Sequence, residues 1–146
     1  MRTLYALLVV TVVAGCASVA PVRVQSGDTC YRCHRAIQDT KLAAEIMEQG
    51  DHLLTSYPFR TAGCMAKYLK ANPAGKSSTI YVTDYRSRTM LEAGSAWFVP
   101  LTLTSADGKK VEHDFAAFAS REDASAFRQD AQAKRWEQVL AEAVPD

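Results

Sequence analysis

The sequence lacks an excess of charge of either sign, because its 146 residues carry 17 Lys and Arg against 16 Asp and Glu. No strongly positive field is available to hold a nucleic-acid backbone, so nucleic acid is excluded as a partner. A large multidomain enzyme is excluded by length, and disorder by the 48% hydrophobic and 23% charged content. The 4 cysteines are too few for a disulfide scaffold but enough for one metal site.

Sequence patterns of catalysis are also missing. The chain has no G-x-S-x-G segment, no Gly-rich phosphate loop, and no pair of carboxylates placed for acid–base work. Nothing in the sequence groups a nucleophile with a base and a residue that orients it. We therefore expect a binding or carrier protein rather than an enzyme.

The N-terminal segment has the pattern of a secretory signal. One positive charge, Arg2, precedes an apolar run that is too short for a stable membrane anchor. The ending Val13-Ala14-Gly15-Cys16 resembles a bacterial lipobox, so we expect cleavage after residue 15 and lipidation of Cys16; an ordinary signal peptide is the alternative. Attached acyl chains would hold the protein on a membrane. Ala17 follows, which favours a periplasm-facing lipoprotein of the outer membrane, with residues 16–28 as a polar tether.

Two stretches of the remaining chain resemble each other, and each suggests a strand end, a helix cap and a helix start. In the first, Thr61 precedes a helical pattern; in the second, Ser120 stands at the matching place, with Asp123 completing a capping box. Hairpin signals precede both stretches. We predict an α+β protein with two small ββα units packed together: residues 29–75 with the metal site, and residues 78–144 with a C-terminal helix.

Two segments within these units are less straightforward to assign. Residues 42–48 have good helix propensity, although the following Gly50-Asp51 turn favours a strand. Residues 122–144 are expected to be mostly helical.

The sharpest motif is Cys30-Tyr31-Arg32-Cys33-His34, in which two thiols stand at a spacing that suits one metal ion. Thiolates are soft ligands that select Cu(I) or Zn. Cys64 is the natural third ligand, because the N-terminus of a helix capped by Thr61 would favour its thiolate. The neighbouring Met65 adds a thioether, which suits Cu(I). Two histidines are further candidate ligands: His34, which Zn would favour, and His113.

Three alternatives remain open for these residues. Cys30 and Cys33 are close enough in sequence to form a disulfide. The same segment also matches the Cys-x-x-Cys-His pattern of c-type haem attachment, in which His34 would ligate the iron; a small monohaem electron carrier is therefore the main rival function. A structural Zn site is the third possibility. Cys64 has no role in the haem alternative.

The chain resembles the NosL-like lipoproteins, which are accessory proteins of nitrous oxide reductase. The resemblance covers roughly Cys30 to Trp136 and rests on the order and spacing of these segments: Cys30/Cys33, Ala43-Ala44-Glu45-Ile46, Gly63-Cys64-Met65-Ala66-Lys67-Tyr68-Leu69, Tyr81-Val82-Thr83-Asp84-Tyr85, Glu92-Ala93-Gly94-Ser95-Ala96-Trp97-Phe98-Val99, Ala117-Phe118-Ala119-Ser120 and Ala124-Ser125-Ala126-Phe127. It implies a periplasmic Cu(I)-binding chaperone that supplies copper to a cuproenzyme. It also implies two treble-clef-like ββα units and a strand at residues 42–48.

The sequence departs from this family at two places near the expected site. The family usually has Gly-Met directly after the second cysteine, where this chain has His34 and Arg35. The family also carries a methionine in the second half before the final helix, where this chain has none and His113 is the nearby candidate. The resemblance therefore supports the cysteines more strongly than any methionine ligand.

Overall fold

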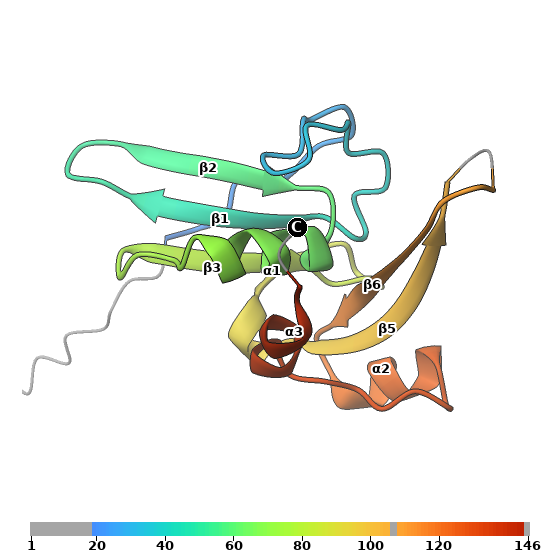
Figure 1. Cartoon of the computed structure of the whole chain (residues 1–146). Helices are drawn as coiled ribbons and strands as arrows, with labels where there is room; N and C mark the ends of the chain where they lie inside the picture. Colours follow the sequence, from blue (N-terminus) through green and yellow to red (C-terminus); the bar gives the residue numbers. More distant parts are fainter. Residues whose placement is uncertain (1–18, 106–107, 145–146) are drawn as a thin grey trace, which may run out of the picture.

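The computed structural model describes residues 19–105 and 108–144 (Figure 1). Cys16 and the expected signal lie outside the described residues. The elements, in chain order, are β1 (Ala44–Gln49), β2 (Leu54–Phe59), α1 (Ala62–Ala71), β3 (Ser78–Thr83), β4 (Met90–Glu92), the short 3-10 helix η1 (Ala93–Ser95), β5 (Trp97–Thr104), β6 (Val111–Phe118), α2 (Arg121–Phe127) and α3 (Trp136–Glu142). Among the described residues, no helix is both long and apolar enough to cross a membrane.

The first sheet is antiparallel and has the strand order β2-β1-β3-β4. Its central strand β1 is hydrogen-bonded to a strand on each side, and residues 44–47 are all buried. This pairing explains why the segment is a strand despite its helix propensity, because tertiary hydrogen bonds and burial outweigh a weak local preference. Strands β3 and β4 complete this sheet, although they lie in residues 78–144, the stretch predicted as the second unit.

The second sheet is the antiparallel hairpin β5-β6, which curves away from the first sheet (Figure 1). Helix α2 packs on this hairpin, and α3 packs against α1, β5 and η1. Helix α1 also contacts β6 directly. This contact brings the end of the second hairpin beside the helix that carries Cys64.

Both predicted helix caps are confirmed. The Thr61 side chain accepts a hydrogen bond from the Cys64 N–H, and the Ser120 side chain accepts one from the Asp123 N–H. Each capped helix follows an antiparallel hairpin, β1-β2 before α1 and β5-β6 before α2. The α+β class is thus confirmed, while the treble-clef-like duplication stays a prediction.

The prediction of a mostly helical C-terminal region was wrong between α2 and α3. Residues 128–135 are not helical, because Lys134 pairs with Phe98 of β5 through two backbone hydrogen bonds of 2.8 and 2.9 Å. Pairing with a strand edge uses the same N–H and C=O groups that a helix would need. The region therefore forms two short helices that cover different parts of the core.

Candidate metal centre

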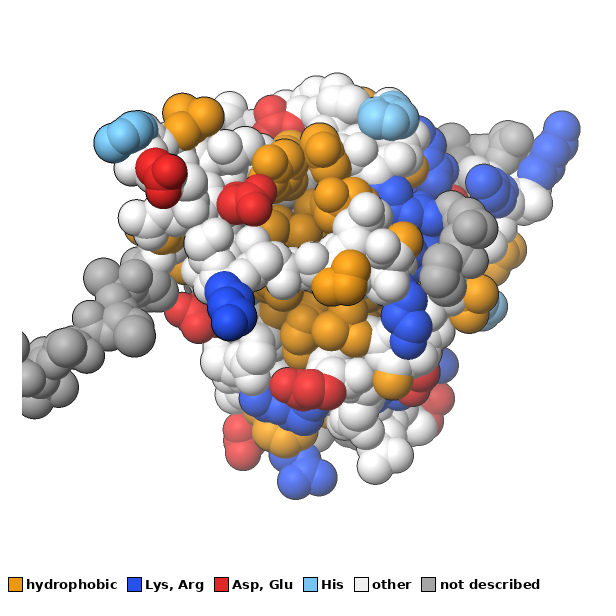
Figure 2. Space-filling view, turned by 60° about the vertical axis from the view of Figure 1, so that its left-hand side comes forward, with side chains coloured by type: hydrophobic (Ala, Val, Ile, Leu, Met, Phe, Trp, Pro, Cys, Tyr) orange, Lys and Arg blue, Asp and Glu red, His pale blue; other side chains and the backbone are white. Residues whose placement is uncertain are grey.

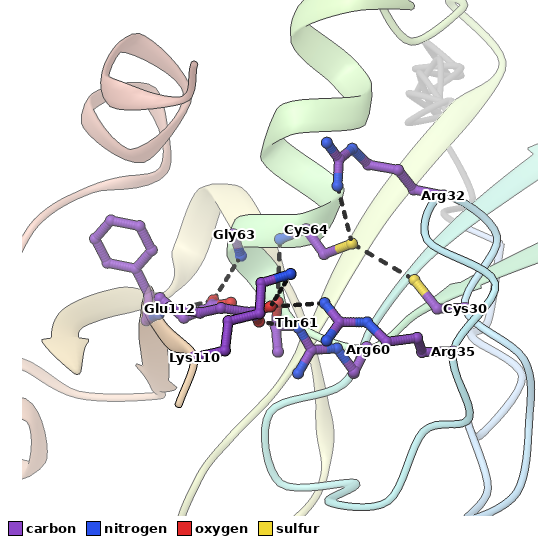
Figure 3. Close-up of polar contacts among 11 residues, drawn as sticks. Cys30, Arg32, Arg35, Arg60, Thr61, Gly63, Cys64, Lys110 and Glu112 are labelled. Carbon is purple, nitrogen blue, oxygen red and sulfur yellow. Dashed lines mark hydrogen bonds and ion pairs between the residues drawn. The ribbon is translucent and has the colours of Figure 1, made fainter. Parts of the chain in front are cut away.

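The structure brings together the three cysteines that the sequence singled out. One ligand atom from each of Cys30, Cys33 and Cys64 lies within 4.8 Å of the others. The Cys30 and Cys64 sulfurs are 3.5 Å apart, and all three residues are free thiols (Figure 3). No disulfide therefore joins Cys30 to Cys33, and the three sulfurs are close enough to share one metal ion.

A tight loop positions Cys30 and Cys33. The Cys30 N–H donates to the Arg35 carbonyl at 2.9 Å, and the His34 N–H donates to the Cys30 carbonyl at 3.0 Å. His34 closes this loop with a φ of 55°, in the left-handed region that favours glycine. This is the position at which the resemblance implies a glycine, so the backbone geometry explains the usual residue there.

Cys64 is positioned by the start of α1. It stands in the first turn, where its N–H bonds to the Thr61 hydroxyl at 3.0 Å. The positive end of the helix stabilises an anionic sulfur at this place, although the contact with Cys30 and burial act against it and raise the pKa of Cys64. The Cys30–Cys33 loop and the start of α1 thus bring the three thiols to one point, as a shared metal site requires.

The three thiols differ in their access to solvent. Cys30 is fully buried and Cys64 is 6% exposed, whereas Cys33 is only partly buried. Cys33 and Cys64 line a cavity of about 890 Å³ that also touches β6 and the end of α3. A metal ion bound to the thiols would therefore be reached from the side of Cys33.

Hydrogen bonds set up unequal thiols. The contact with the Cys64 thiol lowers the pKa of Cys30 to about 4, despite burial, and the backbone N–H groups of Cys33, Arg60 and Arg32 act in the same direction. The same contact, together with burial, raises the pKa of Cys64. One deprotonated sulfur is therefore stabilised before a metal arrives, which is the form that binds soft metals.

Three arginines approach the thiols. The Arg32 Nη1 atom lies 3.8 Å from the Cys64 sulfur, a contact drawn in Figure 3. Arg35 and Arg60 line the same cavity as Cys33. Guanidinium groups stay charged and offer several donors, so they can offset the negative charge of a metal held by three thiolates.

Strand β6 holds this arrangement from the other half of the protein. Glu112 pairs with Arg35 at 2.7 Å and also with Arg60; the hydrogen bond from Arg35, followed by that from Arg60, lowers the pKa of Glu112 to about 2. Two residues further along, Asp114 accepts a hydrogen bond from the Gly63 N–H at 2.8 Å. Burial raises the pKa of Asp114, whose carboxylate also accepts a hydrogen bond from the Phe115 N–H.

The structure does not bring the two candidate histidines into this cluster. His34 and His113 are exposed, and neither belongs to the group of potential ligands found among residues 19–105 and 108–144. His113 stands between Glu112 and Asp114 on β6 and lines the same cavity, but it is not among the side chains whose ligand atoms meet at the cysteines. Met65 is fully buried within the hydrophobic core beneath α1.

Sequence analysis missed Arg32, Arg35, Arg60, Glu112 and Asp114 as parts of the site. One signal was available: Glu112 and Asp114 stand two apart in a strand, which places both acids on one face. Nothing in the sequence indicated that this face meets α1.

The fold and this site define a small α+β protein with a three-thiol centre able to hold a soft metal. The NosL family model matches residues 21–144, and the chain belongs to the NosL family. A similar solved structure is the crystal structure of the copper chaperone NosL from Shewanella denitrificans, with a TM-score of 0.57 and 19% identity over 81% of this chain and 96% of that one. No curated protein matches the chain.

Proposed function

We propose that this protein is a Cu(I) carrier that binds copper through Cys30, Cys33 and Cys64 and passes it to a cuproenzyme. The observation that carries the proposal is the grouping of three free thiols within 4.8 Å, with two of them, Cys33 and Cys64, on the wall of an open cavity. A carrier needs tight binding by soft ligands together with a route for ligand exchange. It needs no catalytic group, so we propose a carrier rather than an enzyme.

The ligand set favours Cu(I) over Zn as cargo. Structural Zn sites are usually closed by four ligands, often with nitrogen or oxygen donors. In the described ranges, the cluster contains three sulfurs and no His, Asp or Glu. Three thiolates suit a soft monovalent ion and leave one side open to an acceptor.

The cellular setting of the proposal rests on the sequence and the family. We propose that lipidation of Cys16 anchors the protein to the outer membrane, facing the periplasm, with nitrous oxide reductase as the recipient. We also infer that the two ββα units are related treble-clef-like repeats.

The rival haem function has little support in this geometry. Covalent attachment would require the Cys30 sulfur to reach a haem vinyl group, but this residue is 0% exposed and its sulfur faces Cys64.

The first test is Cu(I) binding by the Cys64→Ser variant. Losing one of three thiolates should weaken Cu(I) affinity by at least about tenfold, measured by competition with a chromophoric Cu(I) chelator under anaerobic conditions. The matched control is Cys16→Ser in the full chain, which removes the cysteine proposed for lipidation and should leave the affinity unchanged.

The outcomes separate the proposed function from its alternatives. Unchanged copper affinity in Cys64→Ser would show that the site assignment is wrong. A covalent haem adduct that survives denaturation, with or without Cys64, would make the protein a cytochrome instead. Retention of Zn in preference to Cu(I) at equal supply would indicate a structural site.

A further inference from the structure

The open side of the thiol cluster is bordered by five cationic side chains, which we call the cationic rim: Arg32, Arg35, Arg60, Lys67 and Lys110 all line the cavity beside Cys33 and Cys64. This concentration is unusual in a chain whose total charge is nearly balanced. Two rim side chains are well exposed to solvent: the exposed fraction is 70% for Lys110 and 49% for Arg35. A molecule approaching Cys33 therefore meets positive charge first.

The acids along the same cavity are buried or already paired. Asp114 is 4% exposed and its carboxylate serves the start of α1. Glu112 pairs with Arg35 and Arg60 and lies 3.9 Å from the Lys110 Nζ atom, so three rim cations share this one carboxylate. Glu142 accepts two hydrogen bonds from Lys134 at 2.5 and 2.7 Å. These acids reduce the positive field but present little negative charge to a partner.

An aromatic surface adjoins the thiol loop. Tyr31, directly after Cys30, is 44% exposed and packs against the rings of Tyr57 and Tyr68, with centroids 4.7 and 5.5 Å away. Tyrosine and arginine are the residues most enriched at the centres of protein interfaces. Figure 2 shows a face on which hydrophobic side chains gather beside a group of Lys and Arg side chains.

We propose that the cationic rim and the Tyr31 surface form the docking site for the acceptor protein, and that this acceptor carries carboxylates around its copper-receiving ligands. The inference rests on the proposed function and adds the chemistry of the partner. Copper moves between proteins by ligand exchange, so the acceptor must approach on the open side of the cluster, where Cys33 lies. Opposite charge on the acceptor would speed this encounter by about 10- to 1,000-fold at low salt.

The test measures copper transfer from the loaded, full-length Cys16→Ser protein to two synthetic peptides. Both peptides contain the same Cys-x-x-Cys acceptor segment; one is flanked by glutamates and the other by glutamines. By stopped-flow measurement, the glutamate peptide should take up copper at least about tenfold faster at low salt. This preference should shrink as ionic strength rises from about 0.01 M to about 0.15 M, where the screening length falls from about 30 Å to about 8 Å.

Charge variants connect the preference to the rim. Lys67→Glu combined with Lys110→Glu should abolish the preference for the glutamate peptide, and the corresponding double glutamine variant should reduce it to an intermediate value. The matched control reverses two exposed charges that do not line the cavity, Lys76→Glu with Arg88→Glu, and should keep the preference.

The results distinguish the two proposals. Equal transfer rates to both peptides from a protein that binds Cu(I) tightly would overturn the docking inference and leave the carrier function standing. Loss of the preference to the same extent in the Lys67→Glu/Lys110→Glu variant and in the Lys76→Glu/Arg88→Glu control would also overturn it, because total charge rather than the rim would be responsible. If the protein bound no Cu(I) at the loading step, the carrier function would fail and the docking inference with it.

Discussion

At the scale of single residues, the closest constraint on the site is the contact between Gly63 and Asp114. A Cβ atom at position 63 would lie 2.7 Å from the Asp114 Oδ1 atom, which is nearer than side chains tolerate. The carboxylate cannot easily withdraw, since it is buried and bonded to the N–H groups of Gly63 and Phe115. Glycine is therefore required here to let β6 approach the helix that carries Cys64.

We predict that Gly63→Ala destabilises the protein by about 1–3 kcal/mol, because the added methyl group overpacks a buried polar contact. Helix propensity alone would favour alanine by about 1 kcal/mol, so a loss of stability would point to the contact. Urea unfolding of Gly63→Ala and Gly94→Ala makes the comparison, since a Cβ at Gly94 meets nothing within 4 Å. Equal stability of the two variants would contradict the argument.

At the scale of elements, β6 acts as a support for the metal loops. The alternation of the strand directs Glu112 to Arg35 and Arg60, and Asp114 to the start of α1. The two arginines line the same cavity as Cys33. One strand from the second hairpin therefore orients both segments of the first half that supply thiols.

This support should depend on pH through Glu112. Its pKa in the folded protein, about 2, lies below its ordinary value of 4.5, so its contribution is fully present above pH 4.5 and is lost as the pH falls toward 2. Above pH 4.5, Glu112→Gln should lower the stability by roughly 0.5–1 kcal/mol, because the pairs are partly exposed.

Thermal unfolding of the apo protein and of Glu112→Gln across this range measures the effect. The difference between their midpoints should be constant at higher pH and should shrink toward zero as the pH approaches 2. A difference that grew on acidification would give Glu112 the opposite sign and contradict the pairing.

At the scale of the whole molecule, the two sheets stabilise each other through a shared core and two aspartates. One hydrophobic cluster contains Ile46 and Phe59 from the first sheet together with Phe98 from the second. Asp114 of β6 bonds to the start of α1, while Asp84, directly after β3, accepts a hydrogen bond from the Ala119 N–H before α2. Each sheet thus holds the start of the helix that follows the other hairpin.

We therefore expect the protein to unfold in one transition, with the same urea midpoint by far-UV circular dichroism and by fluorescence of Trp97 and Trp136, both of which lie in the second half. Asp84→Ala should lower the stability by about 1–3 kcal/mol, because the N–H groups of Ser87 and Ala119 lose their acceptor. Asp51→Ala, at an exposed turn, is the control and should change little. Two separate midpoints in the unmodified protein would show that the sheets fold independently.

Much of the fold was predictable because it depends on neighbours in the chain. The caps at Thr61 and Ser120 and the β1–β2 hairpin follow from residue types at short spacing. The break between α2 and α3 was not predictable, because it arises from the pairing of Lys134 with Phe98, far apart in sequence.

The sequence by itself determined the chemistry of the centre: a Cys-x-x-Cys pair, a third thiol at a capped helix start, and no competing catalytic motif. Only the tertiary structure decided what surrounds those thiols. The packing of β6 against α1 brought Glu112 and Asp114 to the site, and it gathered the cationic rim beside Cys33 and Cys64. Ligand type is a property of single residues, whereas charge and access depend on which surfaces meet when the chain folds.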